Sequence, residues 1–224
     1  MTVLARRSAG AELARRLGHV RWVAGGTGAG KSTVVRLLAE QYDLQVYDGD
    51  AAGHDHAQRC TPERHPLLWE LARLPLEERY AGRTGAEVFQ SMPSLHGETF
   101  GFVLEDLLGL PADRIVLVDD FSVLPRDVAA LLSWPEQAAF LLPAPEFRRT
   151  SLAGQYADPE RARANWGEAD PDEALEVRMA RDALWDAEVR RQAEELALPT
   201  LNVDGTRTAE DLAAELSARF RLRS

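Results

Sequence analysis

The segment Gly25–Ser32 constrains the fold of this chain more than any other part of it. It reads Gly-Gly-Thr-Gly-Ala-Gly-Lys-Ser, and Lys31 is the only lysine among the 26 Lys and Arg residues of the chain. Glycines allow backbone conformations that other residues avoid, so the segment predicts a tight loop. Because arginine supplies every other basic side chain, the lysine indicates a position that needs a compact ammonium and not a wide, planar guanidinium.

The residues on both sides give this loop a defined context. Residues 21–24 are predicted to form a short buried strand, and residues 32–42 a helix with an apolar face. A strand, a glycine loop and a helix N-terminus together place backbone N–H groups around a phosphate. The spacing is that of a phosphate-binding loop, in which Lys31 holds the β- and γ-phosphates and the Ser32 hydroxyl binds Mg²⁺. The predicted cofactor-binding positions are Gly25, Gly26, Thr27, Gly28, Ala29, Gly30, Lys31, Ser32 and Thr33.

Apolar segments that alternate with helical patterns predict an α/β fold. The expected strands are residues 21–24, 44–47, 114–118, 138–142 and 200–203. This order predicts a three-layer α/β/α sandwich around a parallel sheet, which binds ligands at the carboxyl ends of its strands. Those ends carry the glycine loop, Asp48 and Asp50, Asp119 and Asp120, and the residues after Leu142.

The segments between the strands predict the remaining elements. Helices are expected over residues 1–19, 67–92 with breaks, 98–108, 125–132, 172–196 and 208–220, with caps at Asp170 or Asp172 and at Thr208. Residues 51–66 are expected to be a polar loop. Residues 145–170 are polar, lack strong periodicity, and are expected to be a mobile lid on a single domain that covers residues 1–224.

Composition excludes several kinds of function. The net charge of −10 and the pI of about 5.0 argue against a general nucleic-acid surface. Cys60 is the only cysteine, so no disulfide can form within the chain, and its spacing from nearby histidines matches no standard zinc site. No apolar run reaches membrane-spanning length, and residues 1–19 lack the apolar core of a signal peptide. We expect a cytoplasmic monomer or homodimer that contacts no membrane.

Other residues exclude two classes of phosphate-loop protein. A GTPase requires an Asn-Lys-x-Asp motif, which a chain with Lys31 as its only lysine cannot contain. Residues 151–155, Ser-Leu-Ala-Gly-Gln, approach the signature of transporter ATPases, but they follow the acidic strand end where that family places the signature before it.

The chain resembles the small P-loop kinases, which include nucleoside and nucleotide kinases, shikimate and gluconate kinases and chloramphenicol phosphotransferase. The features that carry the resemblance are the loop Gly25–Ser32, Asp48-Gly49-Asp50, Val118-Asp119-Asp120, and residues 202–206 before the last helix. The resemblance covers residues 21–220. It implies a strand order of 2-3-1-4-5, ATP and Mg²⁺ as cofactors, and a loop of Asp204, Gly205 and Thr206 over the adenine.

The resemblance also implies roles for acidic side chains. Asp50, and after it Asp48, is expected to accept the proton of an acceptor hydroxyl or to orient that hydroxyl. Asp119 or Asp120 is expected to reach Mg²⁺ through water, and the sequence does not distinguish the two.

Kinases of this group close a lid whose arginines contact the transferring phosphate. Arg148 and Arg149 follow the fourth strand and are candidate catalytic residues. Further candidates are Arg161 and Arg163, and then Arg178 and Arg181 as nucleotide contacts. Arg178 and Arg181 are three residues apart and share a helix face, which Asp182 is not expected to share.

Together these residues predict an ATP-dependent phosphotransferase that acts on a hydroxyl or phosphate group of a small molecule. The alternative is a regulatory ATPase that changes conformation without phosphorylating a small molecule. Only a kinase requires an acceptor carboxylate such as Asp50. Residues 51–100 are expected to recognise the acceptor, whose identity their sequence does not reveal.

Overall fold

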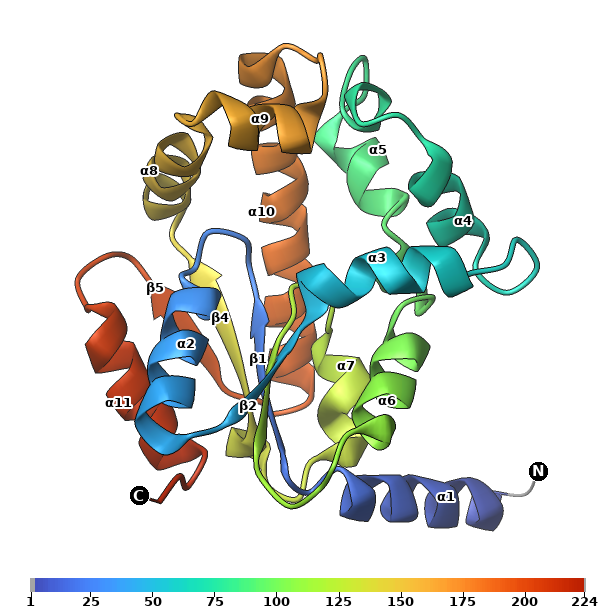
Figure 1. The fold of residues 1–224 in the computed structure, drawn as a ribbon, viewed down its shortest axis with the longest axis vertical. Coiled ribbons are helices and arrows are strands. Elements are labelled where there is room, and N and C mark those ends of the chain that lie inside the picture. The colour runs from blue at the N-terminus through green and yellow to red at the C-terminus, as the bar shows by residue number, and fades with distance from the viewer. Residues whose placement is uncertain (1–2, 224) are drawn as a thin grey trace.

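The computed structural model describes residues 3–223, and they form an α/β fold around one parallel sheet (Figure 1). The strands are β1 Val20–Gly25, β2 Gln45–Asp48, β3 Val116–Asp119, β4 Ala138–Pro143 and β5 Thr200–Val203. All neighbouring strands pair in parallel, in the order β2-β3-β1-β4-β5. The predicted fold class and strand order are therefore confirmed.

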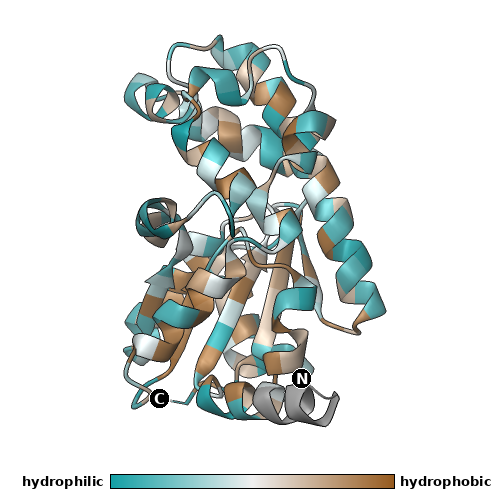
Figure 2. Cartoon of the chain, turned by 90° about the vertical axis from the view of Figure 1, so that its right-hand side faces the viewer, coloured by the Kyte–Doolittle hydropathy of each residue, from teal (hydrophilic) through white to brown (hydrophobic). Residues whose placement is uncertain are grey.

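Two apolar cores cover the two faces of the sheet, because successive strand residues point to opposite sides. Trp22 packs with side chains of α6 Phe100–Gly109, α7 Pro125–Val128 and α10 Pro171–Glu195. The next residue, Val23, packs on the opposite face with side chains of α2 and α11. The bounds of these two helices are Lys31–Tyr42 for α2 and Ala209–Arg219 for α11. Figure 2 shows apolar residues gathered in the strands between these layers.

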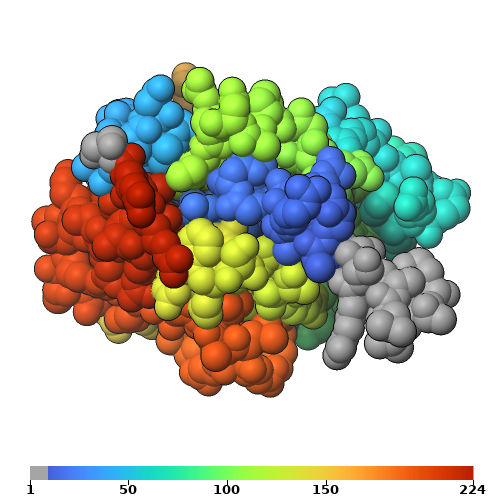
Figure 3. Space-filling view, turned by 90° about the horizontal axis from the view of Figure 1, so that it is seen from below, coloured from blue at the N-terminus to red at the C-terminus, as the bar shows by residue number. Residues whose placement is uncertain are grey.

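The remaining helices lie beyond the two ends of the sheet. At the carboxyl ends of the strands are α3 Gly49–Arg59, α4 Pro66–Arg73, α5 Gly85–Gln90, α8 Pro145–Tyr156 and α9 Pro159–Trp166 (Figure 1). Helix α1 Val3–Arg16 lies toward the opposite end (Figure 1). In Figure 3, which views the molecule from below, the part of the N-terminal region after residue 9 is drawn in blue. Short 3-10 turns complete the fold at Glu77–Arg79, Pro93–His96, Ala129–Leu131 and Pro135–Gln137.

Several expected helices and caps are confirmed. The leading helix expected over residues 1–19 is α1, and residues 1–2 lie outside the described part of the chain. The Asp170 carboxylate caps α10 by accepting from the backbone N–H groups of Asp172 and Glu173, both at 3.0 Å. Thr208 and Asp211 form a reciprocal capping box at the start of α11.

The polar loop expected over residues 51–66 was a wrong prediction for its first part, which is helix α3. Asp48 caps this helix, since its carboxylate accepts the backbone N–H of Ala51 at 3.0 Å. The buried face of α3 is provided by His56, whose Nε2 lies 2.7 Å from a carboxylate oxygen of Asp106. A helix anchored by a histidine shows no aliphatic periodicity, so the pattern that indicates a helix was absent.

The segment expected to be a lid, residues 145–170, forms the two helices α8 and α9. Asp158 caps α9 by accepting from the backbone N–H of Glu160 at 3.0 Å. Trp166, at the end of α9, is buried against Tyr80 and Tyr156. The mobility of this segment stays a prediction.

Among residues 3–223, no helix combines the length and the apolar character that crossing a membrane requires.

Helix α10 is held in place by a close approach of α5. A Cβ atom built on Gly85 would lie 2.5 Å from Cβ of Ala180 and 2.7 Å from the backbone N of Arg181. Gly85→Ala is therefore expected to force the two helices apart and to lower the free energy of unfolding by about 1–3 kcal/mol. Thermal unfolding of the variant measures the loss.

A matched control for that substitution is Gly101→Ala in α6. Apart from its chain neighbours and the backbone of its own helix, no described residue has an atom within 4 Å of a Cβ built there, so alanine is expected to stabilise the helix by about 0.5–1 kcal/mol. Equal melting temperatures for the two variants would contradict the close approach at Gly85.

Candidate active site

The loop between β1 and α2 has the backbone shape that its glycines predicted. Gly25, Gly28 and Gly30 have φ angles of 111°, 77° and 76°, in the region that favours glycine. A Cβ on Gly25 would lie 2.3 Å from the carbonyl oxygen of Leu141 in β4. The first turn of α2 follows directly at Lys31, so the loop joins the sheet to a helix N-terminus.

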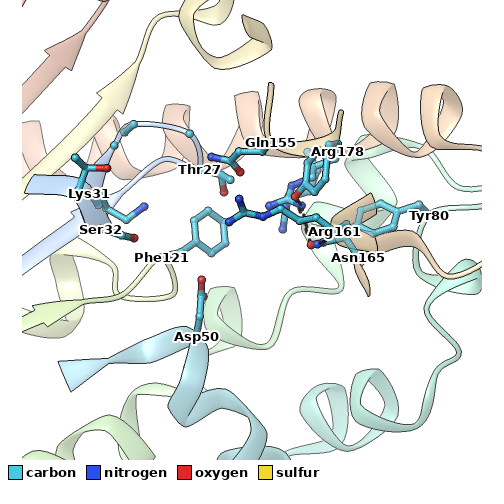
Figure 4. Close-up of a pocket in the computed structure, with 16 residues that line it drawn as sticks. Thr27, Lys31, Ser32, Asp50, Tyr80, Phe121, Gln155, Arg161, Asn165 and Arg178 are labelled. Carbon is cyan, nitrogen blue, oxygen red and sulfur yellow. Dashed lines mark hydrogen bonds between the residues drawn. The ribbon is translucent and has the colours of Figure 1, made fainter. Parts of the chain in front are cut away.

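A cavity of about 640 Å³ lies over this loop. Figure 4 shows Lys31 and Ser32 on one side, Asp50 on another, and Tyr80, Arg161, Asn165 and Arg178 opposite the loop. The residues that line the cavity are Thr27 to Thr33, Asp50, Tyr80, Phe121, Gln155, Tyr156, Arg161, Asn165, Arg178 and Arg181. It therefore brings together the loop, the start of α3, the end of β3, and helices α8, α9 and α10.

Lys31 is buried and turned back over its own loop. Its Nζ donates to the carbonyl oxygen of Gly26 at 3.0 Å and lies 5.9 Å from the ring centre of Phe121. Burial lowers the pKa of the Lys31 ammonium, and nearby carboxylates, Asp119 and Asp50 first among them, oppose that shift. Within residues 3–223, the hydrogen-bond partners of this ammonium are the carbonyl oxygens of Gly25 and Gly26, and an anion in the cavity would be a stronger partner.

The two aspartates at the end of β3 occupy different places. Asp119 lies beside the Ser32 hydroxyl; burial raises the pKa of Asp119, and Ser32 and Lys31 oppose the rise. Asp120 is buried and accepts the backbone N–H of Ser122 at 2.6 Å. The sequence left the choice open, and the structure places Asp119 next to Ser32.

Asp120 has a packing role against the start of α3. A Cβ on Gly49 would lie 2.4 Å from its carboxyl carbon. Burial raises the pKa of Asp120, and its hydrogen bonds with Ser122 oppose the rise.

Asp48 and Asp50 are also separated by the fold. The Asp48 side chain is used as the cap of α3, at 3.0 Å from the backbone N of Ala51. Asp50, two residues later in the first turn of the same helix, is exposed and lines the cavity. Of these two candidates, only Asp50 offers a carboxylate to a ligand in the cavity.

Three of the predicted arginines reach the cavity: Arg161 from α9, and Arg178 and Arg181 from α10. Arg178 donates to the Tyr156 hydroxyl at 2.5 Å. The guanidinium carbon of Arg181 lies 5.2 Å from the ring centre of Phe121. The cavity is thus positively charged on the side opposite the loop.

Asp182 does share the face of Arg178 and Arg181, which corrects the sequence-based expectation. Its carboxylate has no solvent exposure. One oxygen lies 2.6 Å from Nε of Arg181 and the other 3.8 Å from Nε of Arg178. Residues four apart meet on a helix surface, so Asp182 was within reach of Arg178.

The other candidate arginines lie outside the cavity lining, which differs from the roles expected for Arg148 and Arg149. Arg148 is 2% exposed and lies under the loop, where its Nε donates to the carbonyl oxygen of Thr27 at 3.1 Å. Arg149 is exposed and pairs with Glu176 at 2.5 Å. Arg163 is exposed near Glu168, at 3.4 Å.

The predicted adenine loop also lies outside the residues that line the cavity. The Asp204 carboxylate accepts the backbone N–H and the hydroxyl of Thr206 at 3.0 and 2.7 Å. A Cβ on Gly205, which has a φ of 87°, would lie 3.1 Å from the ring of Phe147. The contact of this loop with an adenine stays a prediction.

Sequence reasoning missed five residues of the cavity: Tyr80, Phe121, Gln155, Tyr156 and Asn165. Phe121 carried a usable signal, because it directly follows Asp119-Asp120 at the carboxyl end of a parallel strand. Gln155 and Tyr156 end helix α8, Asn165 lies in α9, and Tyr80 follows the 3-10 turn Glu77–Arg79. None of these four positions directly follows a strand.

Comparisons with known proteins identify no family for this chain. No family model matches it, and no curated protein matches it. A solved structure of an uncharacterized protein from Eubacterium ventriosum is similar over 91% of this chain and 98% of its own, with 12% sequence identity and a TM-score of 0.47.

Asp186 gives the stability of the protein a pH dependence. Burial raises its pKa to about 6, from an ordinary value of 3.8, although Arg148 opposes the rise. Between these two pH values the folded state binds more protons than the unfolded state, so raising the pH destabilises the fold. As the pH rises from about 4 to about 6, we expect the free energy of unfolding of wild type to fall by up to about 3 kcal/mol relative to that of Asp186→Asn.

Urea unfolding of wild type and Asp186→Asn between about pH 4 and about pH 7 measures this change. A stability difference that stays constant over that range would contradict a raised pKa for Asp186.

Proposed function

We propose that this protein is an ATP- and Mg²⁺-dependent phosphotransferase that acts on a small molecule with a hydroxyl or phosphate acceptor group. The observation that carries the proposal is one cavity lined by the glycine loop with Lys31, by the Asp50 carboxylate, and by three arginines on the far side. Phosphoryl transfer requires positioning and charge neutralisation more than covalent catalysis. The cavity contains the groups for both.

The loop side of the cavity suits a nucleoside triphosphate. In the proposed complex, Lys31 exchanges its contact with the Gly26 carbonyl for oxygens of the β- and γ-phosphates. The donor set beside it fits Mg²⁺, because the Ser32 hydroxyl and the Asp119 carboxylate are hard oxygen ligands. Ser32 would bind the metal directly and Asp119 through water. Bound Mg²⁺ supplies neutralisation of phosphate charge.

The opposite side suits the acceptor and the transferred group. Asp50 is proposed to orient an acceptor hydroxyl and to accept its proton. Arg161, Arg178 and Arg181 are proposed to neutralise the charge that the phosphates bring into the cavity. Asp182, buried between two of these arginines, restricts the directions in which they point.

The cellular setting of the proposal follows the sequence expectations. We propose that the enzyme works in the cytoplasm, where ATP and Mg²⁺ are available, as a monomer or homodimer. Its acidic net charge of −10 fits a small-molecule acceptor better than nucleic acid.

Replacing Lys31 tests the phosphate-loop assignment. Lys31→Ala removes the only lysine and is expected to weaken ATP·Mg²⁺ binding strongly and to abolish transfer. The fold is expected to persist, because Lys31 lines the cavity. Burial also lowers the pKa of its ammonium, so the charge itself does not stabilise the folded state. Calorimetry with ATP·Mg²⁺ and a melting curve measure the two effects, and normal ATP affinity in a folded variant would contradict the assignment.

Asp50 and Asp48 form a matched pair of substitutions that separates a kinase from a regulatory ATPase. Asp50→Asn is expected to lower kcat for transfer to an acceptor by about 10²-fold, the effect of losing a general base, with ATP affinity unchanged. Asp48→Asn keeps a side-chain oxygen that caps α3 and is expected to have little effect.

Product formation can be screened with nucleosides, nucleotides, sugars and aminoglycosides as acceptors. Slow ATP hydrolysis without any phosphorylated acceptor, unchanged in both aspartate variants, would favour the regulatory ATPase.

A further inference from the structure

One buried guanidinium joins the phosphate loop to α10, the helix that carries two of the three cavity arginines. Arg148 lies in the first turn of α8, and its Nε donates to the carbonyl oxygen of Thr27 at 3.1 Å. A terminal nitrogen of the same guanidinium donates to a carboxylate oxygen of Asp186 in α10. Both side chains are buried, with 3% and 11% of their surfaces exposed.

This pair packs directly against the glycines of the loop. A Cβ on Gly26 would lie 2.5 Å from the second carboxylate oxygen of Asp186 and 2.7 Å from a terminal nitrogen of Arg148. A Cβ on Gly28 would lie 3.6 Å from Cγ of Arg148. The loop therefore cannot move toward α8 and α10 without displacing the pair.

The contact with Thr27 also determines the direction of the next N–H group. None of the peptide bonds in the described residues is cis. In a planar trans peptide, the carbonyl of one residue and the N–H of the next point in opposite directions. The Thr27 carbonyl points at Arg148, which does not line the cavity. The N–H of Gly28, a residue that does line the cavity, therefore points away from Arg148.

We propose that Arg148 and Asp186 form a positioning clamp that holds the Thr27–Gly28 peptide with its N–H directed at the phosphates of the nucleotide. The clamp rests on the function proposed above. Neither residue lines the cavity, so both act through the loop and not on the substrate. This assigns Arg148 a different role from that of a lid arginine that contacts the transferred phosphate.

The chemistry of the pair suits this role. A planar guanidinium can donate to two acceptors at a fixed angle, whereas an ammonium is a single point charge. Buried ion pairs are weak stabilisers, because apolar residues of similar volume often replace them without loss of stability. Replacing Arg148 and Asp186 by an apolar pair is therefore expected to change the position of the loop and not the stability of the fold.

The clamp also connects the loop on one side of the cavity with the arginines of α10 on the other side. Asp186 is four residues after Asp182, which in turn contacts Arg178 and Arg181, so all four share one face of α10. The phosphate loop is thus tied to the helix face that presents Arg178 and Arg181, two of the three cavity arginines.

The test is the double variant Arg148→Met/Asp186→Leu, which removes both charges together and keeps the volume. It is expected to melt at or above the temperature of wild type. Its affinity for ATP·Mg²⁺ and ADP·Mg²⁺ is expected to fall roughly ten- to hundred-fold, the effect of losing a hydrogen bond to a charged group. Calorimetry measures the affinities.

Three further measurements separate positioning from stability. Arg190→Ala removes one exposed positive charge near Asp186 on α10 and is expected to leave affinity unchanged. Arg148→Lys keeps the positive charge but not the two donor groups that contact Thr27 and Asp186, and is expected to bind ATP·Mg²⁺ more weakly. This variant tests the clamp even if the double variant does not fold. In wild type, the amide resonance of Gly28 is expected to shift when ADP·Mg²⁺ binds, and in Arg148→Lys this shift is expected to be reduced.

The two proposals fail in different ways. If Lys31→Ala binds ATP as tightly as wild type does, the proposed function is overturned, and the clamp with it. Suppose that ATP affinity depends on Lys31, but that folded Arg148→Met/Asp186→Leu or Arg148→Lys binds ATP as tightly as wild type. That result would overturn the clamp alone.

Discussion

The close passage of β1 along β4 at the start of the glycine loop is the contact on which the rest of the site depends. The backbone N–H of Gly26 donates to the carbonyl oxygen of Leu141 at 2.8 Å, and a side chain on Gly25 would collide with that same oxygen. The loop therefore leaves the sheet where β4 ends. As a consequence, α8, which begins just after β4, lies against the loop and brings Arg148 to Thr27.

Charge is concentrated inside the molecule above the sheet, where most proteins bury apolar side chains. Lys31, Arg181, Asp120 and Asp182 are all buried there. Isolated charges of this kind would be costly, and each has an opposite charge or a backbone partner nearby. Such an arrangement stabilises the fold weakly but fixes the directions of the charged groups, which the proposed nucleotide site requires.

The sequence predicted the fold closely, because its signals are local. The strands alternate with helices, which predicted parallel pairing, and Asp170 and Thr208 cap their helices as expected. The order of the strands is not a local signal, and it was expected only from the resemblance to small P-loop kinases. The helix at residues 49–59 was missed because His56, not an aliphatic residue, provides its buried face. Within the site, the loop and Lys31 were predictable, because glycine spacing and a single lysine are visible without knowledge of any distant contact.

The sequence by itself therefore determined the glycine loop with its single lysine, the α/β architecture and the set of charged residues at the strand ends. Only the tertiary structure decided which partners surround each member of the two pairs. The Asp48 carboxylate caps the N-terminus of α3, whereas Asp50 lines the cavity. Asp120 is bound by Ser122 whereas Asp119 lies by Ser32. Neighbouring aspartates are chemically identical in sequence, and their roles diverge because the fold surrounds each with different partners.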